Sequence, residues 1–177
     1  MAPEENIASL LGSGRRTEAF EALLVTYQDK VFRLSYSMLG DRAQAEDAAQ
    51  ESFLRIWKSM DRYRGESNVG TWIFSIARNV CLTAISKRAA RRSAPIEDAE
   101  RGGPDPPDRQ HDILRLVAEL PENYRQVVML FYMEDQSYDE VARLLDLPVG
   151  TVKTHLHRAR QQLASMVKES ASGIRQF

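Results

Sequence analysis

The sequence predicts an all-α protein made of two small helical domains joined by a flexible linker. Apolar residues recur at three- and four-residue steps in both halves, no alternating strand pattern is visible, and a proline-rich polar segment separates the halves. At 177 residues with 43% hydrophobic content, the chain is long enough for two packed cores. We therefore expect an N-terminal tail over 1–17, a first domain over 18–92, a linker over 93–111, a second domain over 112–168 and a C-terminal tail over 169–177.

Three helices are predicted in the first domain. From Phe20 onward the apolar residues keep a helical period that stops at Gly40, a residue typical of helix ends. Asp41 is a suitable N-cap for a second helix, from about Ala43 to Met60. A third helix is expected over Val69–Arg92.

The segment between Ser93 and His111 is rich in proline, glycine and acidic residues and lacks an apolar period, as is typical of a linker. Its 19 residues could extend over roughly 60 Å, which exceeds one turn of duplex DNA at about 35 Å. Two attached domains could therefore reach sites on separate turns.

Composition excludes several classes of protein. No apolar run approaches the roughly 18 residues that span a bilayer, and residues 1–9 lack the order of a signal peptide, so we expect a cytoplasmic protein. The single Cys81 cannot form an internal disulfide and the three histidines are scattered, so we expect no metal and no cofactor. No carboxylate cluster or activated nucleophile is visible, which argues against a nucleic-acid enzyme and a small-molecule substrate.

The formal net charge of −1 hides an uneven distribution. Residues 62–92 carry seven basic residues against Glu66, and residues 149–177 carry five against Glu169. Residues 112–148 are acidic, with eight acidic residues against three arginines. Two basic patches separated by acidic surface suggest one nucleic acid bound at two places, with other faces left for proteins.

The second domain is predicted to end in a helix-turn-helix of two short helices. Ser137 and Glu140 form the pattern of a capping box, the helix breaks at Asp146–Gly150, and the next helix begins near Val149. Helical spacing places the following residues on its outer face: Lys153, Thr154, His157, Arg158 and Gln161. These are candidate DNA contacts, although a basic helix can also be only a solvated surface. His155 lies beside the apolar stripe, where it either packs or contacts phosphate.

One leucine of the second predicted helix falls on a polar face. Leu54 shares this face with Asp47, Gln50 and Glu51. The opposite face is apolar and consists of Ala45, Ala49, Phe53 and Ile56. A lone exposed leucine is ordinary in proteins, but one flanked by acids and an amide also suits the centre of a protein-docking patch.

The loop Arg62–Asn68 and the helical residues Thr71–Asn79 combine basic and aromatic side chains. This composition suits single-stranded DNA, because cations follow the phosphates while aromatic or polar pockets hold unstacked bases. Trp72 and Phe74 have helical spacing, and aromatic residues with this spacing are core residues more often than not. In the loop, no such packing role is expected for Arg64, Glu66, Ser67 and Asn68.

The order of these parts resembles the sigma-70 family of RNA polymerase sigma factors, in its extracytoplasmic-function branch, over about residues 18–168. The resemblance is carried by AEDAAQESFLRIW at 45–57, YRGES at 63–67 with Thr71 and Trp72, LPE at 120–122, SYDEVA at 137–142 and PVGTV at 148–152.

The resemblance implies that the first domain is sigma region 2. Docking on the clamp helices of the polymerase β′ subunit is then expected from Asp47, Gln50, Glu51 and Leu54. Contacts with the −10 promoter element are expected from Arg64, Glu66, Ser67, Asn68, Trp72, Arg78, Lys87 and Arg88. Ile73 stands where the housekeeping branch has a second tryptophan, which leaves a two-aromatic wedge in doubt.

The second domain resembles sigma region 4, whose first half binds the flap of the polymerase β subunit. Its last helix would read the −35 element through Thr151, Lys153, Thr154, His155, His157 and Arg158. The expected partners are core RNA polymerase, promoter DNA and a cognate anti-sigma factor, which could hold the protein at the membrane. The expected function is an alternative sigma factor that catalyses nothing itself. The alternative is a free-standing helix-turn-helix regulator, which would bind duplex DNA tightly without polymerase.

Overall fold

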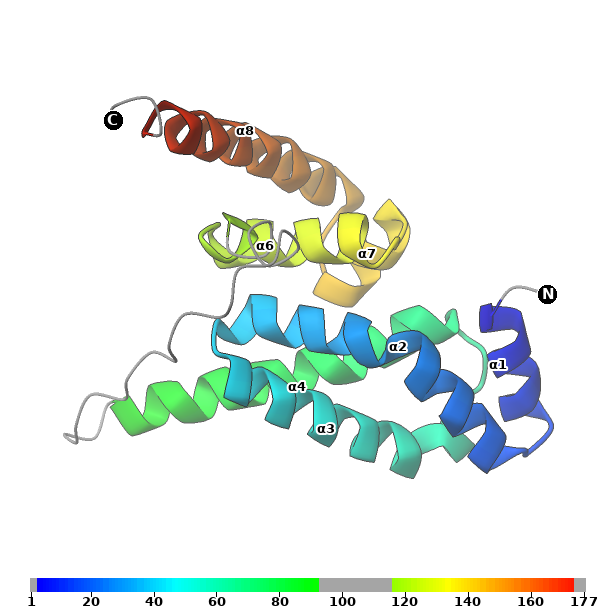
Figure 1. The fold of residues 1–177 in the computed structure, drawn as a ribbon. Helices are drawn as coiled ribbons and strands as arrows, with labels where there is room; N and C mark the ends of the chain where they lie inside the picture. The colour runs from blue at the N-terminus through cyan, green and yellow to red at the C-terminus, as the bar shows by residue number, and fades with distance from the viewer. Residues whose placement is uncertain (1–2, 93–115, 174–177) are drawn as a thin grey trace. The chain divides into compact units, whose positions relative to one another are not determined.

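The computed structural model describes residues 3–92 and 116–173. The chain divides into two compact units, Met1–Gly102 and Gly103–Phe177, and every regular element within the described ranges is helical (Figure 1). The all-α prediction is confirmed. The linker predicted over 93–111 lies outside the described residues.

The first unit is built on three long helices, α2 (Arg16–Leu39), α3 (Arg42–Ser59) and α4 (Val69–Arg92), which pack against one another. Its core includes Leu23, Tyr27, Val31, Leu34, Phe53, Ile56, Ile73, Phe74, Ala77 and Val80. The ring of Tyr27 meets Phe74 edge-on, with centroids 5.9 Å apart. Phe74 is therefore a core residue.

The helix ends of this unit are determined by local capping. Gly40 has φ 68° and its N–H donates to the carbonyl of Tyr36 at 2.8 Å, an arrangement that glycine adopts with little strain. The carboxylate of Asp41 accepts from the N–H of Gln44 at 2.9 Å. The predicted end of α2 and start of α3 are confirmed.

The N-terminal segment is helical and packed, so the prediction of a tail over 1–17 is wrong. Helix α1 (Pro3–Gly12) lies across one end of the α2–α4 bundle and contacts α2 and α4 (Figure 1). Ile7 is fully buried, and the Tyr27 hydroxyl donates to the carboxylate of Glu4. Among the described side chains of α1, Ile7 is the only one fully buried, too few to produce a visible apolar period.

By length and composition alone, residues 69–90 of α4 would suit a membrane span, although no uninterrupted apolar run of that length is present in the sequence. Arg78 and Asn79 interrupt the segment, but its average composition is apolar. Its side chains Ile73, Phe74 and Ala77 are buried inside the first unit. These contacts are those of a core helix, for which the same length and composition are common.

The second unit contains α6 (Glu122–Val128), a π-helical turn η2 (Met129–Met133), α7 (Tyr138–Leu145) and α8 (Val149–Gly173), and residues 116–118 are also helical. Helix α8 packs against α6 and α7. The core includes Val117, Leu120, Val127, Leu130, Val141, Leu145, Val152, Leu156 and Ala159. Residues 112–115, where the second domain was expected to begin, lie outside the described residues.

The helix-turn-helix prediction is confirmed. The N–H of Glu140 donates to the Ser137 hydroxyl, and the N–H of Ser137 donates to the Glu140 carboxylate at 2.8 Å, which completes the capping box. Helix α7 ends at Asp146 in the left-handed conformation. Helix α8 is not short, however. It runs over 25 residues to Gly173, past the predicted tail boundary at 169, because no glycine or proline interrupts residues 151–172.

Candidate nucleic-acid and protein interfaces

The outer face of α3 carries the predicted docking patch, which consists of Asp47, Gln50, Glu51 and Leu54. All four residues are exposed, and Leu54 exposes 55% of its surface. Phe53 and Ile56 are buried on the other side of the helix. The predicted division of faces is confirmed for these residues, while docking itself stays a prediction.

The buried side of α3 differs from the prediction at Ala49, which is only half-buried, whereas Ala48 and Ser52 are buried. The Ser52 hydroxyl donates to the carbonyl of Ala48 at 2.6 Å, which satisfies this buried polar group. Helix α3 packs against both α2 and α4, so its buried arc is wider than a single stripe.

Glu51 is the charged residue of the docking patch with a defined partner. Its carboxylate accepts from Nε of Arg55 at 2.6 Å. This hydrogen bond lowers the pKa of Glu51, and the positive charges of Arg55, Lys58 and Lys87 act in the same direction. Lys87, predicted to contact the −10 element from α4, is the most distant in sequence of these charges.

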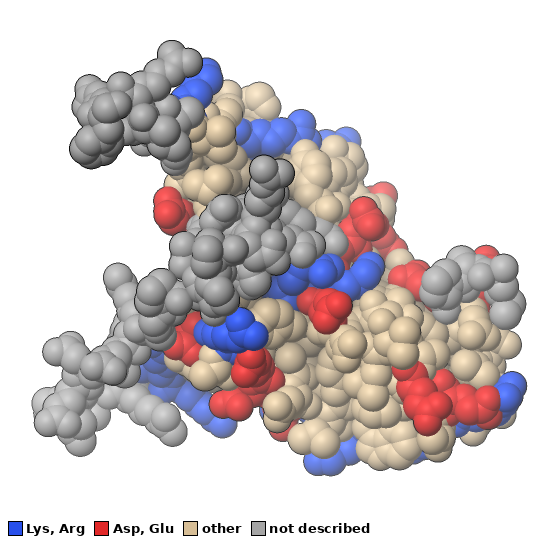
Figure 2. Space-filling view, in the orientation of Figure 1, with Lys and Arg blue, Asp and Glu red and all other residues tan. Residues whose placement is uncertain are grey.

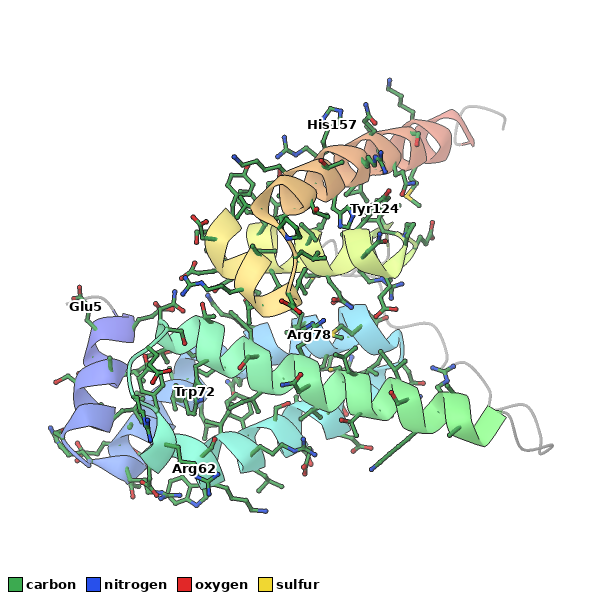
Figure 3. All side chains as sticks on the ribbon, turned by 180° about the vertical axis from the view of Figure 1, so that it is seen from behind. Glu5, Arg62, Trp72, Arg78, Tyr124 and His157 are labelled. Carbon is green, nitrogen blue, oxygen red and sulfur yellow. The ribbon has the colours of Figure 1, made fainter. Side chains whose placement is uncertain are left out.

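A hollow of about 540 Å³, called the capture hollow below, lies where the chain passes from the short 3₁₀ turn η1 (Met60–Arg62) to α4. It is lined by Asp61, Arg62, Tyr63, Arg64, Glu66, Ser67 and Trp72. Arg62 and Trp72 lie at the same end of this unit in Figure 3. Four of the predicted −10 residues, Arg64, Glu66, Ser67 and Trp72, are thus brought together around one concave surface.

Tyr63 shapes the capture hollow, although it was not among the predicted contacts. Its hydroxyl donates to the carbonyl of Ser67 at 2.7 Å, and its ring lies 5.0 Å from the Trp72 ring, centroid to centroid. Gly65, at φ 71°, allows the loop to turn back between Tyr63 and Ser67. Burial raises the pKa of Tyr63, and the charge of Glu4 adds to the increase.

Asn68 has a structural role in addition to its predicted DNA contact. Its side-chain oxygen accepts from the N–H of Thr71 at 2.6 Å, as an N-cap does at the start of α4. Replacing Asn68 by alanine would remove this cap, at a cost of about 1 kcal/mol. Loss of DNA binding in that variant could come from the lost cap or from the lost DNA contact. Arg64 and Glu66, which are exposed, are therefore better positions to test base capture.

The other predicted −10 residues of α4 lie away from the capture hollow. Arg78 is half-buried and lies farther along the helix from Trp72 in Figure 3. Lys87 is exposed and Arg88 half-buried near the end of α4. Their contacts with the −10 element stay a prediction.

Replacing Tyr63 by phenylalanine should weaken capture of a single-stranded −10 oligonucleotide by the holoenzyme about fivefold, the equivalent of one hydrogen bond of about 1 kcal/mol. The ring would still pack on Trp72, so the change reports on the bond to the Ser67 carbonyl. The measurement is the Kd of a fluorescent oligonucleotide. Tyr36→Phe, on α2 and outside the hollow, is the control and should bind normally. Unchanged affinity in Tyr63→Phe would count against a role for this bond.

Helix α8 presents the predicted recognition face. Val152, Leu156 and Ala159 are buried against the rest of the unit. The residues predicted on the outer face are all exposed: Lys153, Thr154, His157, Arg158 and Gln161. His157 projects from the outer side of α8 in Figure 3, and Figure 2 shows basic side chains along this helix. The face is therefore polar, basic and exposed within the second unit.

Three of the predicted −35 residues contact other residues of the second unit. The Thr154 hydroxyl donates to the Gly150 carbonyl at 2.9 Å, and Nζ of Lys153 lies 5.4 Å from the centre of the Tyr138 ring. His155 is half-buried and meets the ring of Tyr124 edge-on at 5.2 Å. This contact supports the packing alternative for His155 over a phosphate contact. Thr151 is also half-buried, at the start of the helix.

The fold and these surfaces define a class of protein with one helical unit that carries an aromatic and basic hollow and a second that carries a helix-turn-helix. Residues 23–91 match the family described as Sigma-70 region 2, and residues 110–163 match Sigma-70, region 4.

Similar proteins cover most of the chain. The ECF RNA polymerase sigma factor SigW of Bacillus subtilis is 31% identical over 172 residues, which cover 86% of this chain and 90% of the relative. The ECF RNA polymerase sigma-E factor of Haemophilus influenzae is 32% identical over 168 residues, covering 85% and 88%. This chain belongs to the ECF RNA polymerase sigma factors, and it is an alternative sigma factor that directs transcription initiation.

Two solved structures share the fold. One is the sigma factor RpoE in complex with the anti-sigma factor NepR from Bartonella quintana, with a TM-score of 0.71 and 23% identity over 84% of this chain and 96% of that one. The other is CnrH in complex with the cytosolic domain of CnrY, with a TM-score of 0.70 and 21% identity over 94% and 98%.

Proposed function

We propose that this protein binds core RNA polymerase and uses its two units to contact the −10 and −35 elements of a promoter. The observation that carries the proposal is the capture hollow, where basic and polar loop side chains meet Trp72. A free-standing regulator that reads only duplex DNA has no use for such a hollow. That alternative is also not favoured by the two sigma-region matches.

In this proposal, each surface acts at one step of transcription initiation. The docking patch on α3 binds the clamp helices of the polymerase β′ subunit, and the acidic first half of the second unit binds the β flap. The recognition face of α8 reads the −35 element. The capture hollow then holds an unpaired base of the −10 element and favours strand opening, because unstacking that base costs a few kcal/mol.

The protein catalyses nothing itself in this proposal and acts in the cytoplasm through its partners. A cognate anti-sigma factor is the expected inhibitor. Support comes from the two structural neighbours, which are described in complex with NepR, an anti-sigma factor, and with the cytosolic domain of CnrY. The same surfaces that bind polymerase are the ones such an inhibitor would have to cover.

The proposed domain map places sigma region 2 at 18–92, a linker at 93–111 and sigma region 4 at 112–168, with α1 added to the first domain. Limited proteolysis should cut first between Ser93 and His111, because proline-rich polar sequences expose their backbone to proteases. Mass spectrometry of the fragments would locate the cut. Preferred cleavage within α3 would contradict the map.

Transcription by purified components tests the function directly. Core polymerase with this protein should produce promoter-selective transcripts from a genomic fragment library, and core polymerase alone should not. The free protein should bind the same promoters weakly in the absence of polymerase. Tight, sequence-specific duplex binding without polymerase, together with no change in transcription, would support the free-standing regulator instead.

A further inference from the structure

Arg16, at the first turn of α2, connects the N-terminus of the first unit to the chain that leads into the capture hollow. Its guanidinium donates to the Asp61 carboxylate and to the carbonyl of Trp57, and lies over the Trp57 ring at 4.4 Å from the centroid. Arg16 is separated from Asp61 by 45 positions in the sequence. One side chain thus holds the end of α3 and the 3₁₀ turn η1 that follows it.

Asp61 is one of the residues that line the capture hollow. The Arg16 guanidinium is partly shielded, with 32% of its side chain exposed, while the Asp61 side chain is 69% exposed. The planar guanidinium donates hydrogen bonds to a carboxylate and to a carbonyl near a helix end at the same time. It therefore restrains the positions of both groups. The wall of the hollow formed by η1 therefore depends on a contact from α2.

Helix α1 also acts on a residue of the capture hollow. The charge of Glu4 in α1 acts on the Tyr63 phenol, which closes the loop of the hollow onto Ser67. Both α1 and Arg16 precede residue 23, where the match to sigma region 2 begins. The match to sigma region 2 thus does not include this support of the hollow.

We propose that Arg16 is a positioning residue for −10 strand capture, which it supports by holding Asp61 and the end of α3. This inference rests on the proposed function of the capture hollow. Arg16 touches no DNA in this mechanism. Its contribution is to keep η1 in place, so that the loop after it meets a separated base without first having to become ordered.

The test compares Arg16→Ala with Arg15→Ala in the holoenzyme, on a fluorescent single-stranded −10 oligonucleotide. Arg15 is a matched control, because its ion pair with Glu18 lies within one turn of the exposed start of α2 and does not reach the hollow. Arg16→Ala should reduce oligonucleotide affinity roughly fivefold or more. Arg15→Ala should leave it unchanged, and both variants should bind core polymerase like the wild type.

A double-mutant cycle with Asp61→Asn separates positioning from general stability. Because Asp61 is one of the groups that Arg16 holds, the double variant should lose little more affinity than Arg16→Ala alone, whereas independent effects would add. Asp61 is exposed, so Asp61→Asn also keeps the test valid if Arg16→Ala fails to fold. Wild-type capture in Arg16→Ala, or additive losses in the cycle, would overturn the inference. Failure of the wild-type holoenzyme to capture the strand would instead overturn the proposed function.

Discussion

Replacing Leu54 by alanine is expected to weaken binding to core RNA polymerase by about 30-fold, the effect of losing about 2 kcal/mol at the centre of an interface. Leu54 exposes 55% of its surface among the polar residues of the docking patch, so its side chain is available to a partner. The free energy of unfolding should change by less than about 0.5 kcal/mol, because Leu54 is outside the core. Fluorescence anisotropy and thermal unfolding would measure the two quantities.

Val25 offers a matched control for this experiment. It is an apolar residue of α2 with 82% of its surface exposed, outside the docking patch, and Val25→Ala should bind core polymerase normally. Asp47→Ala should weaken binding in the same direction as Leu54→Ala. If Leu54→Ala unfolds, the assignment of helix faces is wrong. If Leu54→Ala and Asp47→Ala both bind normally, the docking surface lies elsewhere on the protein.

The variant Arg158→Ala should lose roughly 1–3 kcal/mol of promoter binding and change the base preference at one or two −35 positions. Arg158 is exposed on the outer face of α8, opposite the buried side formed by Val152, Leu156 and Ala159. From that position its guanidinium can form a bidentate contact with a guanine edge in the major groove. The measurement is holoenzyme affinity for a panel of −35 variants at two salt concentrations.

Arg160 and Lys168 are the controls on the same helix. The guanidinium of Arg160 lies 5.6 Å from the centre of the Tyr132 ring, on another side of α8, so Arg160→Ala should leave base preference unchanged. Lys168→Ala should weaken binding equally on all sequences, if at all, and reduce its salt dependence. Equal losses on every −35 variant for Arg158→Ala would identify it as a phosphate contact. Lys153, Thr154 and His157 would then remain as candidate readers.

Much of the fold could be predicted from short stretches of sequence. The end of α2 at Gly40, the cap at Asp41 and the capping box of Ser137 and Glu140 all depend on residues within four positions of one another. The exposed faces of α3 and α8 follow from helical spacing, which repeats over a few residues. Helical spacing did not predict α1, because Ile7 alone among its described side chains is fully buried.

The candidate sites were predicted less completely. Residues Arg64, Glu66, Ser67 and Trp72 were selected from composition and resemblance, and the structure places them around one hollow. Asp61 and Tyr63 were missed as members of that hollow, since their roles depend on Arg16 and on the Ser67 carbonyl. A polar side chain facing a backbone carbonyl leaves no pattern in the sequence.

By itself, the sequence determined helices α2, α3, α4 and α7, the caps at Gly40, Asp41 and Ser137, and the polar faces of α3 and α8, because each depends on interactions between near neighbours in the chain. Tertiary structure alone decided that α1 packs on the first unit and that Arg16 restrains Asp61. It also decided that His155 turns toward Tyr124. These contacts join residues 31 to 45 positions apart or whole helices, and they form only when packing of the apolar cores brings distant segments together.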